Sequence, residues 1–194
     1  MAGLYPVLLA AGAVAVVDWA GAGRRRTAAV GAALVLSLGL NSLLMLPLVP
    51  VGRLGGTPIA DINYDAGETV GWPRFAATVE EVRADLPDGE RIAVLTANYG
   101  EAGAIDRFAP HLGPAYSAHN AYWSWGPPPE HAGTVIVVGY PEERLTPWFG
   151  RVELATRVDN GVELDNEEQG APIWVATDRQ APWSEIWPEL RRLG

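Results

Sequence analysis

The 194-residue sequence contains no cysteine and no lysine. Without cysteine the chain can form no disulfide, and it has no thiol nucleophile and no thiolate metal ligand. All 14 basic residues are therefore arginines, and 23 acidic residues outweigh them to give a formal net charge of −9. Because nucleic acid binding needs a concentrated positive surface, this balance argues against a nucleic acid partner. The length leaves room for one ordinary domain and a modest additional segment.

Charged side chains are also missing from one long stretch near the N-terminus. None occurs between Arg26 and Arg53, and residues 27–51 consist mainly of Ala, Val, Leu and Gly. About 25 helical residues at about 1.5 Å each are long enough to cross a hydrocarbon core of about 30 Å. We therefore predict two transmembrane α-helices, at about residues 3–22 and 27–49. A cleaved signal peptide fits less well, because the arginines follow the first apolar run.

The basic residues of this region predict its orientation. Arg24–Arg26 lie between the two predicted spans, and basic loops between short spans stay in the cytoplasm. Residues 1–53 would then form a membrane hairpin with a cytoplasmic arginine loop. The remainder of the chain, which holds 22 of the 23 acidic residues, would be extracytoplasmic. The sequence thus predicts a multi-pass protein of the cell membrane, with the lipid bilayer as its first partner.

Beyond the hairpin, apolar runs alternate with helical patterns. Residues 54–70 are predicted to be a linker, and residues 71–194 a small α/β extracytoplasmic domain with a mostly parallel sheet. Its first helix begins near Trp72 and ends before a turn at Pro87, Asp88 and Gly89. The later predicted strands are residues 91–97, 134–140, 151–158 and 173–177, and the later predicted helices are residues 98–108, 141–149 and 183–190.

Two motifs hold the candidate substrate-binding residues. NYGEAGAIDRF (residues 98–108) follows the first predicted strand and opens a helix, a position where α/β sheets place ligands. Its polar residues are Asn98, Tyr99 and Glu101, which could hydrogen-bond a neutral polyol such as a sugar. Alternatively, Glu101 only complements the helix dipole and the glycines only permit close packing.

The second motif, YSAHNAYWSWGPPP (residues 116–129), is rich in aromatic residues. Aromatic faces beside amide and imidazole groups suit pyranose rings, which have apolar faces and hydroxyl rims. Alternatively, the aromatic side chains pack on the core, on the membrane or on another protein. A single short crossover separates the two motifs, so we expect them to be close in space. The candidate residues of this motif are His119, Asn120, Tyr122, Trp123 and Trp125.

An acidic turn precedes the last predicted strand at Asp165–Gly170. Acidic turns can hold Ca²⁺, but the spacing of an EF-hand is absent, and a solvated turn is the interpretation that we favour. The three histidines have no metal-binding spacing, and no nucleophile motif is present. The sequence therefore predicts no metal site and no cofactor, and it identifies no catalytic residue.

Four strings give the chain a family resemblance. It resembles the C-terminal portion of bacterial membrane glycosyltransferases of family 39, in the GT-C class, related to protein O-mannosyltransferases and lipid A aminoarabinose transferases. The resemblance implies a polyprenyl-phosphate-linked sugar as donor and transfer on the extracytoplasmic side. The strings are NSLLMLPLVPV (41–51), the two motifs above, and DNEEQGAPIWV (165–175).

The chain also differs from that family in one respect, the segment that carries the catalytic carboxylate. In that family the catalytic carboxylate lies in the first extracytoplasmic loop of a long multispan region, and no segment here matches it. We therefore expect a truncated gene product, a fragment of a longer reading frame, or a stand-alone module that works with a separate catalytic subunit. Two non-enzymatic hypotheses remain open, a membrane-anchored carbohydrate-binding module and an interaction subunit.

Overall fold

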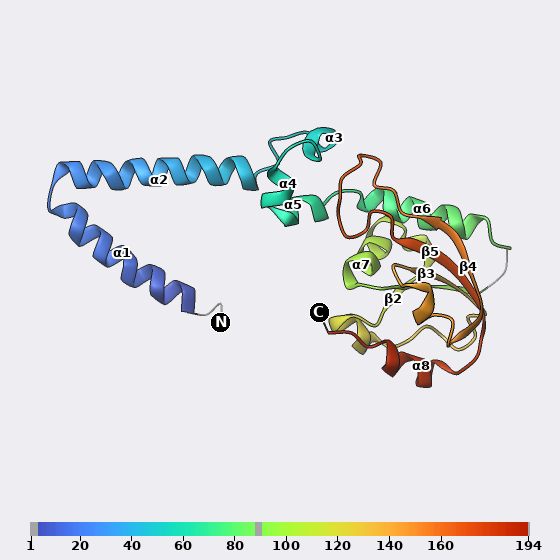
Figure 1. Cartoon of the computed structure of the whole chain (residues 1–194). Helices are drawn as coiled ribbons and strands as arrows, with labels where there is room; N and C mark the ends of the chain where they lie inside the picture. The colour runs from blue at the N-terminus through green and yellow to red at the C-terminus, as the bar shows by residue number, and fades with distance from the viewer. Residues whose placement is uncertain (1–3, 88–90, 194) are drawn as a thin grey trace. The chain divides into compact units, whose positions relative to one another are not determined.

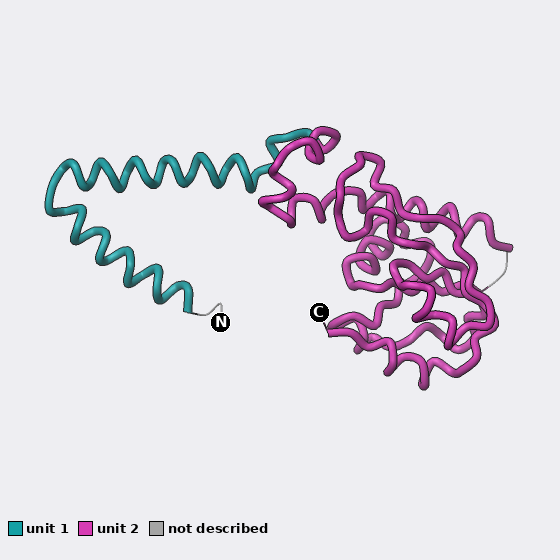
Figure 2. The backbone as a smooth tube through the Cα atoms, viewed as in Figure 1, with its two compact units in different colours: residues 1–50 teal, residues 51–194 magenta. Residues whose placement is uncertain are grey.

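The computed structural model describes residues 4–87 and 91–193 and divides the chain into two compact units, Met1–Pro50 and Val51–Gly194 (Figure 2). The expected helix start at Gly3 and the expected turn at Asp88 and Gly89 lie outside the described residues.

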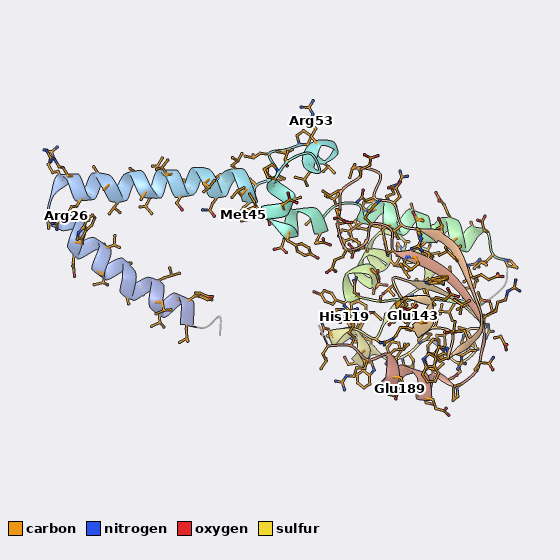
Figure 3. The ribbon with its side chains drawn as sticks, viewed as in Figure 1. Arg26, Met45, Arg53, His119, Glu143 and Glu189 are labelled. Carbon is orange, nitrogen blue, oxygen red and sulfur yellow. The ribbon has the colours of Figure 1, made fainter. Side chains whose placement is uncertain are left out.

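The first unit consists of two apolar helices, α1 (Tyr5–Gly21) and α2 (Arg24–Met45). Neither helix contains a buried residue, and their side chains project into the surroundings (Figure 3). By length and composition, α2 is long enough to cross a membrane, and an 18-residue window of it has a mean hydropathy of 1.9, whereas α1 has only 17 residues. The two predicted apolar helices are therefore confirmed as helices.

The ends of α2 differ from the prediction. Arg24–Arg26 form its first turn instead of a loop, so the connection to α1 consists of Ala22 and Gly23. At the other end the helix stops at Met45, because Leu46 turns to an extended conformation just before Pro47.

Residues 51–70, which include the segment expected to be a linker, belong to the second unit. They form three short helices, α3 (Val51–Leu54), α4 (Ile59–Ile62) and α5 (Tyr64–Glu68). The Asn166 amide donates hydrogen bonds to the carbonyls of Gly67 and Val70, at 3.3 and 3.2 Å. The loop that precedes the last strand is thereby attached to the segment that follows α5.

Five strands form one sheet in the order β2-β1-β3-β5-β4. The pairs β1·β2 and β1·β3 are parallel, whereas β3·β5 and β4·β5 are antiparallel. The sheet is therefore mixed, and the predicted parallel arrangement holds only for its three-stranded part. β4 and β5 depart from it because the chain returns directly from one to the other without a crossover helix. The strands are β1 (Ile92–Thr96), β2 (Ala115–Ser117), β3 (Thr134–Val138), β4 (Phe149–Arg157) and β5 (Pro172–Arg179).

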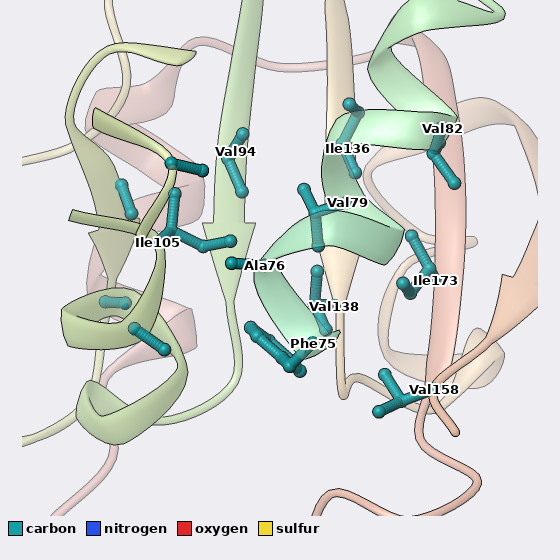
Figure 4. Packing of buried hydrophobic residues seen from close by; sticks show 14 residues of the cluster. Phe75, Ala76, Val79, Val82, Val94, Ile105, Ile136, Val138, Val158 and Ile173 are labelled. Atoms are coloured by element: carbon teal, nitrogen blue, oxygen red, sulfur yellow. The ribbon is translucent and has the colours of Figure 1, made fainter. Parts of the chain in front are cut away.

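Helices cover both faces of the sheet (Figure 1). On one face, α6 (Trp72–Ala84) and α7 (Tyr99–Phe108) bury Phe75, Val79 and Ile105 against Val94 and Ile136, and Figure 4 shows this packing. On the other face, α8 (Trp183–Leu190) packs on the alternate residues of the same strands. The helix expected at residues 141–149 is a single 3₁₀ turn, Glu142–Arg144, and residue 149 already starts β4.

Candidate functional site

Three parallel strands end at the same edge of the sheet. The chain runs from β1 to β2 on one side and then to β3 on the other, so β1 and β3 flank a topological switch point, where α/β sheets place their ligands. Asn98, His119 and Tyr140 each lie two residues beyond the end of their strand. β5 is antiparallel to β3, so its preceding loop brings Glu168 to the same edge.

Asn98 and Glu101 begin α7 with a reciprocal capping box. The Asn98 Oδ1 atom accepts from the Glu101 backbone N–H at 2.8 Å, and Glu101 Oε2 accepts from the Asn98 backbone N–H at 3.0 Å. These two bonds satisfy backbone donors that a helix start leaves unpaired. Glu101 therefore has a structural role at the start of α7, and this role uses one of its two carboxylate oxygens, Oε2.

The other carboxylate oxygen of Glu101 lies against Gly139, the first residue after strand β3. The side chain is only 2% exposed, and a Cβ added to Gly139 would come within 2.5 Å of Glu101 Oε1. Burial raises the pKa of Glu101 to about 8, and the charge of Glu168 adds to this rise, whereas the Asn98 backbone N–H and the charge of Arg192 oppose it. Glu101 is therefore largely protonated at neutral pH.

Glu168 is the second buried carboxyl group of this edge. It is 6% exposed; its Oε1 atom accepts from Asn98 Nδ2 at 3.5 Å, and its Oε2 atom is buried without a partner among the described residues. Burial raises the pKa of Glu168 to about 7, and the charge of Glu68 raises it further. The edge thus holds two carboxyl groups that gain protons more readily than ordinary ones.

His119 adds an imidazole that makes no hydrogen bond within the described part of the chain. It is 7% exposed, and both its Nδ1 and Nε2 atoms are buried without partners. Its ring lies 5.1 Å, centroid to centroid, from the ring of Tyr99. Burial lowers the pKa of His119, and the charge of Arg192 lowers it further, against an opposing effect of Glu167. The imidazole is therefore neutral at neutral pH.

Arg192 is placed at the edge by the backbone. Its N–H donates to the Ala118 carbonyl at 3.0 Å, and its carbonyl accepts from the Asn120 N–H at 2.9 Å, so it forms a parallel bridge with His119. The charge of Arg192 lowers the pKa of both Glu101 and His119. We call Glu101, His119, Glu168 and Arg192 the edge cluster.

The edge cluster combines hydrogen-bond donors and acceptors; Glu101, His119 and Glu168 are buried, whereas Arg192 is exposed. At neutral pH it offers a protonated carboxyl group, a neutral imidazole and an arginine. Some of its polar atoms are unpaired, and each buried polar atom without a hydrogen bond costs about 1–3 kcal/mol of stability. A polar ligand with several hydroxyl groups would satisfy these atoms. Beside the cluster, burial and the charge of Glu101 raise the pKa of Tyr140 to about 12, so its hydroxyl remains protonated.

The residues of the aromatic motif divide into two groups. Trp123 belongs to the fold, because its Nε1 donates to the Trp187 carbonyl at 3.2 Å and the Trp187 Nε1 donates back to the Trp123 carbonyl at 3.1 Å. Arg191 also lies over the Trp123 ring, at 4.2 Å from its centroid. Trp123 therefore anchors the motif to α8, which agrees with the packing alternative for this residue.

The other aromatic residues of the motif lie nearer to solvent. Trp125 is 71% exposed, and its ring centroid is 4.2 Å from that of Tyr122, whose hydroxyl donates to Asp106 Oδ2 at 3.1 Å. Asp106 belongs to α7, so the two sequence motifs contact each other here and again at the Tyr99–His119 ring pair. Asn120 contributes its backbone to the bridge with Arg192 and has a φ of +52°.

The acidic turn is packed against α5. Three carboxylate oxygens, one each from Glu68, Glu167 and Glu168, lie within 4.8 Å of one another, a grouping that could hold a metal ion. Three surface hollows among the described residues lie away from this edge; they are lined mainly by residues of α6, of the segment that follows it, such as Leu86, and of the strands.

The sequence motifs did not include every residue of this edge. Glu68, Tyr140 and Arg192 lie outside every motif, and Glu168 was noted only as part of the acidic turn at Asp165–Gly170, not as a substrate-binding residue. The capping box was readable from the Asn98-x-x-Glu101 spacing.

A search with family models, a search of curated proteins and a search of solved structures each found no match to this chain.

Proposed function

We propose that this chain is the C-terminal part of an integral membrane glycosyltransferase that uses a polyprenyl-phosphate-linked sugar, with the edge cluster contacting the sugar. The observation that supports this most is His119, an imidazole buried at a sheet edge with both nitrogens unpaired. Both sequence motifs of the family resemblance converge on this residue, one through the Tyr99 ring and one through its own backbone.

The chemistry of the edge suits a sugar. Tyr99 is half exposed and offers an aromatic face beside the imidazole, and the apolar face of a pyranose packs on such a surface. Sugar hydroxyl groups both donate and accept, so they can pair with His119 and with the free oxygen of Glu168. Arg192 provides a positive charge for a linking phosphate.

The first unit supports the membrane part of the proposal. We propose that α1 and α2 span the bilayer, with the arginines at the start of α2 in the cytoplasm and Val51–Gly194 outside it. The support is the exposed apolar surface of both helices, the length of α2 and the positions of the arginines.

Transfer by this chain alone is not part of the proposal. No residue here is assigned as the catalytic base, because no segment matches the loop that carries the family's catalytic carboxylate. The second unit would hold the donor's sugar or the acceptor, and the catalytic group would come from a multispan segment or a separate subunit.

The test is binding by the full chain in lipid nanodiscs. A polyprenyl-phosphate hexose is titrated by calorimetry, with the same polyprenyl phosphate lacking its sugar as comparison. We expect tighter binding of the sugar-linked lipid and at least a tenfold loss of that preference in His119→Ala, since the unpaired nitrogens would no longer meet sugar hydroxyl groups.

His131→Ala is the matched control, because His131 is exposed and lies outside both edge and core. The unfolding temperature of each variant reports whether it is folded. Equal affinity for the two lipids, or equal loss in His119→Ala and His131→Ala, would contradict the proposal.

The orientation can be tested with single cysteines, since the native chain has none. In intact cells a membrane-impermeant maleimide should label Glu189→Cys, on α8, and should label Ala22→Cys, between α1 and α2, only after permeabilisation. The reverse pattern would contradict the proposed topology.

A second candidate function is a membrane-anchored, non-catalytic carbohydrate-binding or interaction module. The exposed Trp125 beside Tyr122 favours it, since such a ring pair can pack on a sugar or on a partner protein. Binding that depends on Trp125 and not on His119 would select this module over the first candidate.

A further inference from the structure

A second cluster lies next to the edge cluster and is built from three glutamates. Glu68 comes from α5, and Glu167 and Glu168 come from the loop before β5. One carboxylate oxygen from each lies within 4.8 Å of the other two. Residues almost 100 positions apart therefore bring three negative charges together.

Hydrogen bonds to backbone groups hold these two segments in place. Asn166 binds the carbonyls on either side of Glu68, and the Glu167 N–H donates to both Glu68 oxygens, at 3.2 and 3.3 Å. The Tyr64 hydroxyl also interacts with this group, and the pKa of Tyr64 is raised by its hydrogen bond to Glu167 and by the charge of Glu68. The carboxylates thus converge in a fixed geometry although like charges repel.

The burial of Glu168 adds an independent observation. This side chain is almost fully buried, and its Oε2 atom meets no hydrogen-bond donor within the described residues. A buried carboxylate oxygen without a donor or a cation is costly.

We propose that Glu68, Glu167 and Glu168 bind one Ca²⁺ ion. Carboxylate oxygens are hard ligands, and Ca²⁺ takes them at about 2.3–2.6 Å, so two ligands of one ion are at most about 5 Å apart. The spacing of the three oxygens fits that limit without rearrangement. The ion would join α5 to the loop before β5. Glu168 belongs to both clusters, so a bound ion would compete for the oxygen that otherwise pairs with a sugar hydroxyl.

The test uses the full chain in detergent after removal of metals with a chelator. Titration calorimetry with CaCl₂ should show one site, and the unfolding temperature should rise by about 5–10 °C at 100 times the Kd. Glu168→Gln should remove the binding and the thermal shift. Without Ca²⁺ this variant should unfold at or above the wild-type temperature, because it removes a repelling charge.

Asp165→Asn and Asp65→Asn are the matched controls. Each removes one exposed carboxylate from the same loop or the same short helix without touching the cluster, so each should retain at least half of the affinity. Glu68→Gln provides a second ligand variant if Glu168→Gln does not fold. Absence of Ca²⁺ binding by the wild-type chain, equal binding by the folded ligand variants, or tighter binding of Mg²⁺ than of Ca²⁺ would overturn the proposal.

Discussion

The two units use the same apolar residue types in opposite ways. In α2 the 22 residues include no buried one, and Leu36 is 74% exposed, whereas all five residues of β3 are buried. In the second unit the buried apolar side chains pack between the sheet and the helices that cover it. In the first unit the apolar surface would face the bilayer that we propose. Apolar composition alone thus does not distinguish a core from a surface, and the surroundings of each side chain decide the effect of a substitution.

The largest expected difference between the units is the cost of shortening an apolar side chain. Ile136→Ala removes three carbons from a fully buried position and should lower the free energy of unfolding by about 2–5 kcal/mol. Leu36→Ala, on the exposed surface of α2, should change it by less than about 0.5 kcal/mol. Denaturant unfolding of the full chain in detergent measures both. A similar loss in the two variants would show that α2 is packed against protein.

Glycine substitutions should sharpen the same comparison with a smaller effect. Gly139 has a φ of +77°, and an added Cβ would collide with the Glu101 carboxylate, so Gly139→Ala should cost about 1–3 kcal/mol. Gly39 of α2 and Gly133 before β3 have no atom within 4 Å of an added Cβ. Gly39→Ala and Gly133→Ala should therefore leave the unfolding temperature unchanged or raise it. Equal stability of all three variants would refute the close approach of Glu101 to Gly139.

The smallest effect per step of the measurement is expected for the pH dependence of the second unit, counted per pH unit. The pKa of Glu101 is about 8 in the folded chain and about 4.5 unfolded, so the folded state binds more protons between these values. The free energy of unfolding should fall as the pH rises from about 4.5 to 8, by at most about 1.4 kcal/mol per pH unit from this group. Glu101→Gln preserves the capping box and should flatten the decline. An unchanged pH profile in this variant would show that Glu101 is not the group responsible.

The elements that sequence alone predicted are those with a strong local pattern. The terminal helix Trp183–Leu190 and the helix opened by Asn98 agree with the structure, as do the apolar strands β1 and β3. The antiparallel pairing of β4 and β5 was not predicted, because strand order depends on contacts across the sheet. The three-residue strand β2 is too short to give a pattern of its own.

The position of the site could be predicted from the sequence only as far as the ends of the strands could be predicted. Asn98 and His119 meet at one edge because β1 and β2 are parallel neighbours. The sequence predicted that their motifs would be close, from the short crossover between them, but it did not predict β2. Glu168 and Arg192 reach that edge through long-range pairing, which no local spacing encodes. Trp123 was a candidate for binding, and its reciprocal bonds to Trp187, 64 residues away, place it in the fold instead.

The main-chain bridge between His119 and Arg192 joins the end of the polypeptide to the unpaired imidazole. Any load or fused protein that pulls on the last residues would act first on two hydrogen bonds, those of the Arg192 N–H and carbonyl. The segment after α8 therefore helps to hold His119 in position, and a displacement of Arg192 would be transmitted to the imidazole.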